Sequence, residues 1–165
     1  AASQVAIKMF GTNGGGFFGV NSAHPLENPN YFTNMVENVC IVLIPLAMIF
    51  ALGYVLKRKK FAWMVFAVMT AGFLLLVVPS IYQEMKGNPA IHNMGVSQQL
   101  GSMEGKEVRF GSAASAFWGI TTTCTSNGSV NAWEESNALL NLHWQMFTQF
   151  VDVRDDLLDG SLIEI

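Results

Sequence analysis

The sequence predicts an all-α, polytopic membrane protein, and two observations support this fold class. The composition is 51% hydrophobic and only 13% charged, whereas soluble domains carry about 25% charged residues. The chain also contains two long runs without a charge, Val39 to Leu56 and Phe61 to Tyr82. A helix rises about 1.5 Å per residue, so about 20 residues cross the hydrocarbon core of a bilayer. The alternative, a buried hairpin in a large soluble protein, rarely contains two adjacent runs of this length.

Four consecutive positive charges, Lys57 to Lys60, separate the two uncharged runs. Short loops rich in Lys and Arg are typical of the cytoplasmic side of a membrane. We therefore expect residues 39–82 to form two transmembrane helices joined by a cytoplasmic turn, with their other ends on the outer side. The net charge of −3 is too small to indicate a nucleic-acid partner, and the sequence has no basic patch with interleaved aromatic residues.

Two stretches rich in Gly, Thr, Ser and Asn resemble each other, Thr12 to Gly16 (TNGGG) and Ser126 to Val130 (SNGSV). Each follows a segment with at most one charged residue, Ala2–Phe10 or Ser112–Cys124, that is too short to span a bilayer. Irregular backbone at membrane depth is tolerated only where it is buried in protein or lines a water-filled path. Glycines in such a loop let successive carbonyls turn inward and replace the hydration shell of an ion. The pattern therefore predicts two loops that bind a cation.

Two other interpretations apply to the glycine-rich stretch at residues 11–29. A phosphate-binding loop needs a Lys and a hydroxyl residue directly after its glycines, or a strand before them. The sequence has no such Lys, and a membrane span follows, so a soluble phosphate-binding enzyme is disfavoured. The interpretation of these residues as a glycine-rich surface turn stays open.

Three stretches carry a resemblance to a known family: ASQVAIKMFGTNGGGFFGVNSAHPLENP, MEGKEVRFG and TTTCTSNGSVNA. They resemble, in order and approximate spacing, the potassium-binding subunit of the Kdp-type potassium-transporting ATPase. The resemblance covers residue 2 to about residue 132. It implies a member of the potassium-transporter superfamily, built from four span–pore–span repeats around one pore. This chain then holds the end of the second repeat and the third repeat through its filter.

The resemblance also implies the ligand, its site and the partners. Carried over by position, the filter residues are Thr12, Asn13, Gly14, Gly15 and Gly16, followed by Thr125, Ser126, Asn127 and Gly128. Their backbone carbonyls coordinate K⁺ on the extracytoplasmic side, before its transfer to the P-type ATPase of the complex. The partners are the Kdp ATPase subunits B, C and F, of which the first is that P-type ATPase. Together they form a potassium-uptake pump in the bacterial inner membrane, where lipid surrounds the spans. The potassium-binding subunit itself hydrolyses nothing, in agreement with the absence of a DKTGT motif, and no organic cofactor or transition metal is implied.

These expectations divide the chain into four parts. Residues 1–38 contain the end of pore loop two with its filter and outer loop, and residues 39–82 contain the two spans. Residues 83–132 contain an outer loop, pore helix three and its filter. Residues 133–165 form an acidic tail that departs from the family, because its charges are costly in hydrocarbon. We expect a truncated or altered C-terminus there, with a diverged soluble tail as the alternative. The alternative function is a truncated, non-transporting fragment or a small membrane-associated protein.

The remaining polar residues have mainly structural interpretations. The three histidines, His24, His92 and His143, share no metal-ligand spacing. The two cysteines, Cys40 and Cys124, are expected to be packing residues, and Glu37 is expected at the membrane interface. Four charged residues precede pore helix three: Glu104, Lys106, Glu107 and Arg109. A solvated turn and a set of ion pairs that hold the outer vestibule explain these four equally well.

Overall fold

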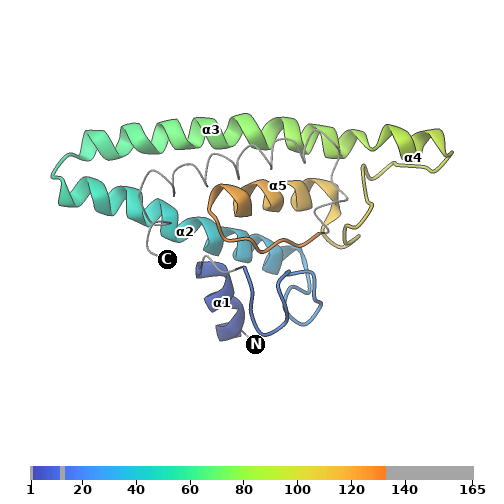
Figure 1. Ribbon diagram of the computed structural model, residues 1–165, viewed down its shortest axis with the longest axis horizontal. Helices are drawn as coiled ribbons and strands as arrows, with labels where there is room; N and C mark the ends of the chain where they lie inside the picture. Colours follow the sequence, from blue (N-terminus) through green and yellow to red (C-terminus); the bar gives the residue numbers. More distant parts are fainter. Residues whose placement is uncertain (1, 12–13, 133–165) are drawn as a thin grey trace, which may run out of the picture.

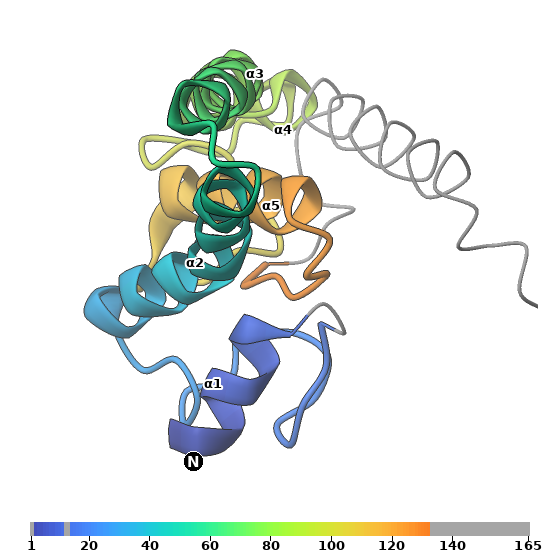
Figure 2. The same cartoon turned by 90° about the vertical axis from the view of Figure 1, so that its left-hand side faces the viewer.

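The computed structural model describes residues 2–11 and 14–132, and this part of the chain is helical without a β-strand. Its helices are α1 (Ala2–Phe10), α2 (Tyr31–Val55), α3 (Lys59–Lys86), α4 (Pro89–Asn93) and α5 (Gly111–Cys124). Helices α2 and α3 form a long antiparallel hairpin, and α5 packs against both of them (Figure 1). Helix α1 packs on α2, on the side away from α3 (Figure 2). The predicted all-α class is confirmed for the described residues.

Helix α2 begins well before the apolar run that starts at Val39. Asn30 caps it, because its side chain accepts a hydrogen bond from the Thr33 amide at 3.0 Å. The Thr33 hydroxyl in turn accepts one from the Asn30 amide at 3.2 Å. This reciprocal capping box satisfies two amide groups that a helix otherwise leaves unpaired. The capping box therefore starts α2 at Tyr31, eight residues before Val39.

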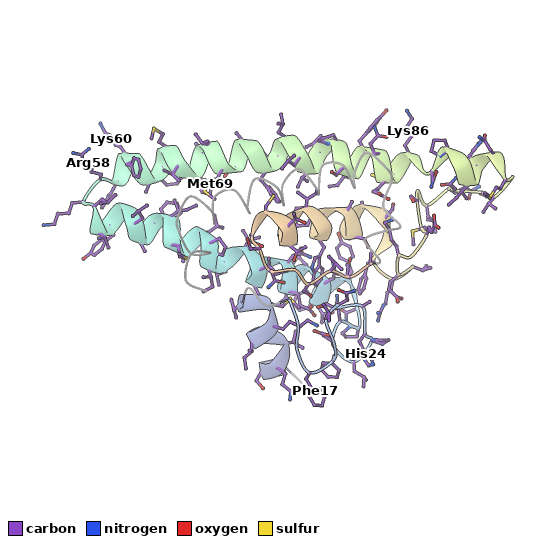
Figure 3. All side chains as sticks on the ribbon, in the orientation of Figure 1. Phe17, His24, Arg58, Lys60, Met69 and Lys86 are labelled. Carbon is purple, nitrogen blue, oxygen red and sulfur yellow. The ribbon has the colours of Figure 1, made fainter. Side chains whose placement is uncertain are left out.

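The turn of the hairpin is shorter than the basic cluster. Lys57 adopts a left-handed conformation, with φ of +53°, and α3 begins at Lys59, so the last two lysines of the cluster are helical. Gly53 lets the helices approach closely here: a Cβ on it lies only 2.4 Å from the Ala62 Cβ. Arg58 and Lys60 lie at this end of the hairpin and Lys86 lies near the other (Figure 3).

Two helical stretches, Tyr31–Val55 and the one that begins at Lys59, are long and apolar enough to cross a membrane. Their most apolar windows are only 22% and 11% buried within the described structure. A core helix of a soluble protein is mostly buried, so this exposure favours helices whose apolar faces contact lipid or further protein.

The interior beside the hairpin is more polar than apolar. A small apolar cluster of Met9, Ile41 and Trp118 joins α1, α2 and α5, and Cys40 packs against it. Cys124 is exposed at the end of α5, so the packing prediction holds for Cys40 only. Glu37, which was expected at the membrane interface, is only 4% exposed and is therefore buried inside the protein.

Candidate functional site

The two predicted filter stretches meet in the structure. We call residues 14–22 the first return segment and residues 125–131 the second return segment, because each follows a short helix. Gly14 is buried with φ of +61°, and a Cβ on it lies 2.7 Å from the Asn127 carbonyl oxygen and 2.8 Å from the Gly128 carbonyl carbon. Gly128 is also left-handed, with φ of +81°. Only glycine combines this conformation with so close an approach. The structure therefore brings Gly14 and Gly128 together, while Thr12 and Asn13 lie outside the described residues.

Both short helices end at this contact. Helix α1 ends at Phe10, just before the first return segment, and α5 ends at Cys124, just before the second. The Thr125 hydroxyl donates a hydrogen bond to the Thr121 carbonyl at 2.8 Å and satisfies part of the end of α5. The carboxyl end of a helix carries a partial negative charge and favours a nearby cation. Two such ends, with carbonyl-rich backbone after them, form an electrostatic setting that suits a cation.

The side chain of Asn127 links the second return segment to α1. Its Nδ2 donates hydrogen bonds to the carbonyls of Lys8, Met9 and Gly11, at 3.1, 3.2 and 2.5 Å. Its Oδ1 accepts a hydrogen bond from the Ser129 amide at 3.1 Å. The side-chain amide therefore completes the end of α1, and only the backbone carbonyl of Asn127 is left to serve as a cation ligand.

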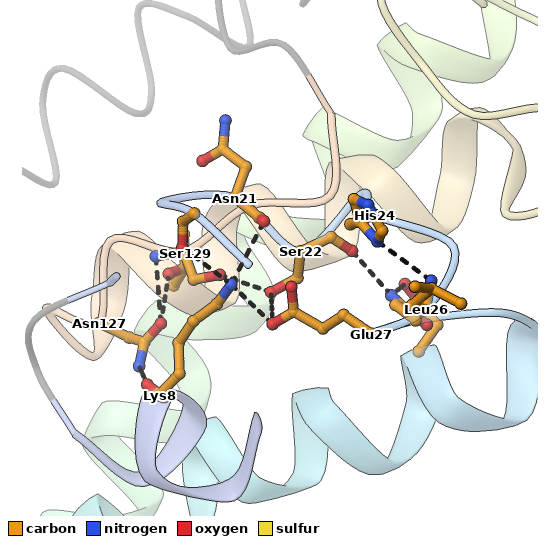
Figure 4. Close-up of polar contacts among 12 residues, drawn as sticks. Lys8, Asn21, Ser22, His24, Leu26, Glu27, Asn127 and Ser129 are labelled. Atoms are coloured by element: carbon orange, nitrogen blue, oxygen red, sulfur yellow. Dashed lines mark hydrogen bonds and ion pairs between the residues drawn. The ribbon is translucent and has the colours of Figure 1, made fainter. Parts of the chain in front are cut away.

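A charged pair that the sequence predictions missed contacts the first return segment (Figure 4). Lys8 Nζ lies 2.6 Å from Glu27 Oε1, and both side chains are 1% exposed. Lys8 Nζ also donates to the carbonyls of Asn21 at 3.2 Å and Gly19 at 3.3 Å. One signal for this pair is present in the sequence, since Lys8 and Glu27 are the only charged residues before Glu37. Two lone charges of opposite sign in an uncharged stretch indicate a buried pair.

The two return segments are joined beyond the glycine contact. The Ser22 amide donates a hydrogen bond to the Val130 carbonyl at 2.7 Å, and the Ser22 and Ser129 hydroxyls are 2.8 Å apart. Trp118 of α5 donates from Nε1 to the Ser129 carbonyl at 2.6 Å. Buried polar groups that are fully paired in this way specify one arrangement of the backbone. Backbone, hydroxyl and indole contacts together thus join the two return segments at this point.

The four charged residues before α5 do not act as one group. Lys106 is buried and forms an ion pair with Glu84 of α3 at 3.0 Å. Arg109 donates to the carbonyl of Ala23, the residue directly after the first return segment. Glu104 and Glu107 are exposed, although Glu107 lies 3.5 Å from Arg109. Lys106, Glu107 and Arg109 thus take part in ion pairs, and Glu104 fits a solvated turn.

The histidines have separate surroundings. His24 stacks on Phe18, with ring centroids 5.4 Å apart, and its Nδ1 accepts a hydrogen bond from the Leu26 amide. His92 lies in α4, and His143 lies outside the described residues. Within residues 2–11 and 14–132, no group of three or more His, Cys, Asp or Glu side chains could hold a metal ion.

A hollow of about 650 Å³ opens where α1 and α5 end, against the middle of α2. Pro45 lies in its wall, and proline removes one helical hydrogen bond, which leaves a carbonyl one turn earlier without its helical partner. The hollow is lined by Phe10, Gly11, Ile41, Ile44, Pro45, Met48, Thr125, Ser126 and Asn127. Its walls thus combine apolar side chains with the backbone of both helix ends.

Comparison with known proteins identifies the family. The family model described as potassium-transporting ATPase A subunit matches residues 1–154. The chain belongs to this family. The match continues beyond Ala132, where the resemblance was expected to end, and stops short of the C-terminus. The predicted acidic tail lies outside the described residues.

Several curated relatives bear the name potassium-transporting ATPase potassium-binding subunit. The protein of Flavobacterium psychrophilum is 61% identical over 137 residues, covering 83% of this chain and 24% of the relative. That of Flavobacterium johnsoniae is 57% identical over 152 residues, covering 92% and 26%. That of Sorangium cellulosum is 51% identical over 142 residues, covering 82% and 24%. The chain therefore spans about a quarter of the length of the curated relatives it matches.

Proposed function

We propose that this chain is part of the potassium-binding subunit of an ATP-driven potassium pump, and that the return segments supply two parts of its selectivity filter. K⁺ is held by backbone carbonyls of residues 12–16 and 125–128. The observation that carries the proposal is the contact between Gly14 and Gly128, both left-handed and both next to the end of a short helix. The names of the relatives supply the ion.

Physical chemistry favours carbonyl ligands over side chains in this arrangement. The Thr125 hydroxyl donates a hydrogen bond to a carbonyl of α5, and the side-chain amide of Asn127 donates one to a carbonyl at the end of α1. Both side chains therefore have structural partners. Left-handed glycines turn neighbouring carbonyls to one side of the chain, which is how a filter replaces the hydration shell of K⁺. The helix ends add a field that favours positive charge.

The other parts of the proposal follow from the family. Helices α2 and α3 cross the bacterial inner membrane as one part of a multi-pass subunit, with Lys57–Lys60 on the cytoplasmic side. The remaining filter parts come from the rest of that protein. ATP is hydrolysed by a separate P-type ATPase chain of the pump, and two further small chains complete the complex. Potassium selection is therefore a property of the complete potassium-binding subunit.

The test uses Gly128→Ala in the complete ATPase complex, with Gly95→Ala as its matched control. Both glycines are left-handed, with φ of +81° and +79°, but Gly95 has no atom within 4 Å of an added Cβ, whereas Gly128 faces Gly14 at 3.8 Å. The backbone strain caused by an alanine is therefore similar at the two positions. The sites differ in that only Gly128 lies against the other return segment. The measurement is the K⁺ dependence of ATP hydrolysis, repeated with Rb⁺.

We expect Gly128→Ala to raise the KM for K⁺ by about ten-fold or more, since about 1.4 kcal/mol of lost binding is a factor of ten. Its discrimination between K⁺ and Rb⁺ falls as well. Gly95→Ala keeps the KM and the discrimination of the unmodified pump. Equal K⁺ affinities and equal discrimination in the two variants would show that the second return segment is not part of the filter.

A further inference from the structure

The ammonium group of Lys8 occupies a site built from oxygen atoms. Its Nζ lies 2.6 Å from a Glu27 carboxylate oxygen and within 3.3 Å of two backbone carbonyls, those of Gly19 and Asn21. Carboxylate and carbonyl oxygens are the ligands that hard cations prefer. Lys8 therefore supplies a cation that is covalently tethered to α1, and the first return segment folds around it.

The stem of Lys8 supports the same segment. A Cβ on Gly16 lies 2.9 Å from Lys8 Cδ, so the backbone of the segment rests directly on the lysine methylenes. The Lys8 carbonyl also accepts a hydrogen bond from Asn127, which lies in the second return segment. One residue of α1 thus contacts both return segments, with its side chain on one and its backbone on the other.

Glu27 continues the connection from Lys8 to the second return segment. The Ser22 hydroxyl lies 3.4 Å from Glu27 Oε1 and 2.8 Å from the Ser129 hydroxyl, and every side chain on this route is buried (Figure 4). The route runs from the Lys8 ammonium through Glu27 and Ser22 to Ser129. It joins the two return segments at Ser22 and Ser129, and neither serine is among the proposed filter residues.

We propose that Lys8 is a positioning residue whose tethered ammonium fixes the spacing of the two return segments and thereby sets K⁺ affinity and K⁺/Rb⁺ discrimination. This inference rests on the filter proposed above. The charge itself is required, because a neutral side chain leaves the buried Glu27 carboxylate without its counter-ion and the two carbonyls without their donor. The carbonyls then turn, and the proposed ligands of the first return segment move with them.

The experiment compares Lys8→Met with Lys106→Met in the complete ATPase complex. Both substitutions replace one member of a buried Lys–Glu pair by a neutral side chain of similar length. The Lys106–Glu84 pair has a separation of 3.0 Å and both side chains are 0% exposed, but it joins α3 to the outer loop. The KM for K⁺, the kcat at saturating K⁺ and the K⁺/Rb⁺ ratio are measured for each variant.

We expect Lys8→Met to raise the KM for K⁺ by about ten-fold to a hundred-fold, the range expected for loss of a charge-assisted contact. Its K⁺/Rb⁺ discrimination falls, and its kcat at saturating K⁺ changes less than the KM. Lys8→Arg retains the charge and restores part of the affinity. Lys106→Met lowers the yield of the complex but leaves the KM and the discrimination unchanged.

Ser22→Ala keeps the ion pair, removes the hydroxyl that links Glu27 to Ser129, and is expected to raise the KM by a smaller factor. If the Lys8→Met complex does not assemble, the KM of Ser22→Ala tests the proposal in its place.

An unchanged KM for K⁺ in an assembled Lys8→Met complex overturns the proposal. If Lys8→Met does not assemble, an unchanged KM in Ser22→Ala overturns it. If Gly128→Ala lowers K⁺ affinity in the same assay, the filter assignment stands although the Lys8 inference fails. If Gly128→Ala has no effect, the filter assignment itself fails.

Discussion

The α2–α3 hairpin and the region around the return segments are held together by opposite kinds of contact. The hairpin carries apolar side chains on its outer surface, such as Val68 at 67% and Leu75 at 68% exposed, and its helices approach through Gly53 and Ala62. The region formed by α1, α5 and the return segments buries polar and charged groups instead, with Lys8 and Glu27 at its centre.

The difference predicts how each region tolerates substitution. In lipid, helices gain little from burying apolar surface, so an apolar side chain on the outer face can be exchanged at small cost. A buried polar group that loses its partner costs about 1–3 kcal/mol, and more if it is charged. The stability of the hairpin should therefore depend on side-chain size only where the two helices are in close contact. In the return segments, the loss of a single hydrogen-bonding atom should already lower stability.

The largest effect is expected from Asn127→Asp. The new oxygen replaces Nδ2 and faces the carbonyls of Lys8, Met9 and Gly11, so three hydrogen bonds become repulsive contacts. We expect a loss of about 3 kcal/mol of folding free energy, visible as a lower thermal midpoint of the detergent-solubilised complex. Asn93→Asp, at the exposed end of α4, is the matched control and should leave the midpoint unchanged. Equal midpoints in the two variants would mean that the Asn127 amide does not hold α1.

An intermediate effect is expected from Gly53→Ala in the hairpin. The added methyl group lies 2.4 Å from the Ala62 Cβ, so the helices must separate near the turn. Overpacking of this kind costs about 1–3 kcal/mol. Gly72→Ala tests the same substitution in α3, where no atom lies within 4 Å of the new methyl, and helix propensity predicts a gain of up to about 1 kcal/mol. The thermal midpoints should move in opposite directions. Two equal shifts would refute the close contact.

The smallest effects on stability are expected from two nearly isosteric substitutions, one in each region. Thr121→Val removes a buried hydroxyl that donates to the Phe117 carbonyl at 2.7 Å, and we expect a cost of about 1 kcal/mol. Leu75→Ile changes only the shape of an exposed apolar side chain and should fall within about 0.5 kcal/mol of zero. The same midpoint assay measures both. A larger fall of the thermal midpoint for Leu75→Ile than for Thr121→Val would contradict the predicted difference between the two regions.

The same contrast explains what could be predicted from sequence. The two spans follow from run length, because a bilayer imposes a length on any uncharged helix. Helix α1 ends at Phe10 and α5 ends at Cys124, as the short segments before each glycine-rich stretch indicated. The start of α2 at Tyr31 was missed, because its capping box lies in a polar stretch that resembles a loop.

The contacts around the return segments could not be predicted in this way. Lys8 and Glu27 pair across 19 positions, and Ser22 meets Ser129 across 107, so neither contact has a local pattern. The TNG and SNG stretches indicated that the two glycines belong to similar loops, but only the fold shows that Gly14 and Gly128 touch. The family resemblance implied Asn127 as an ion-binding residue, and in the structure its side chain is hydrogen-bonded to the end of α1.

The most direct test of the central claim is to locate the ion itself. Rb⁺ or Tl⁺ bound to the complete potassium-binding subunit scatters anomalously and can be placed by crystallography without reference to the protein. The account predicts a peak coordinated by backbone carbonyl oxygens of the two return segments, beside the contact of Gly14 with Gly128. A peak held by side chains elsewhere, with none beside these glycines, would contradict it.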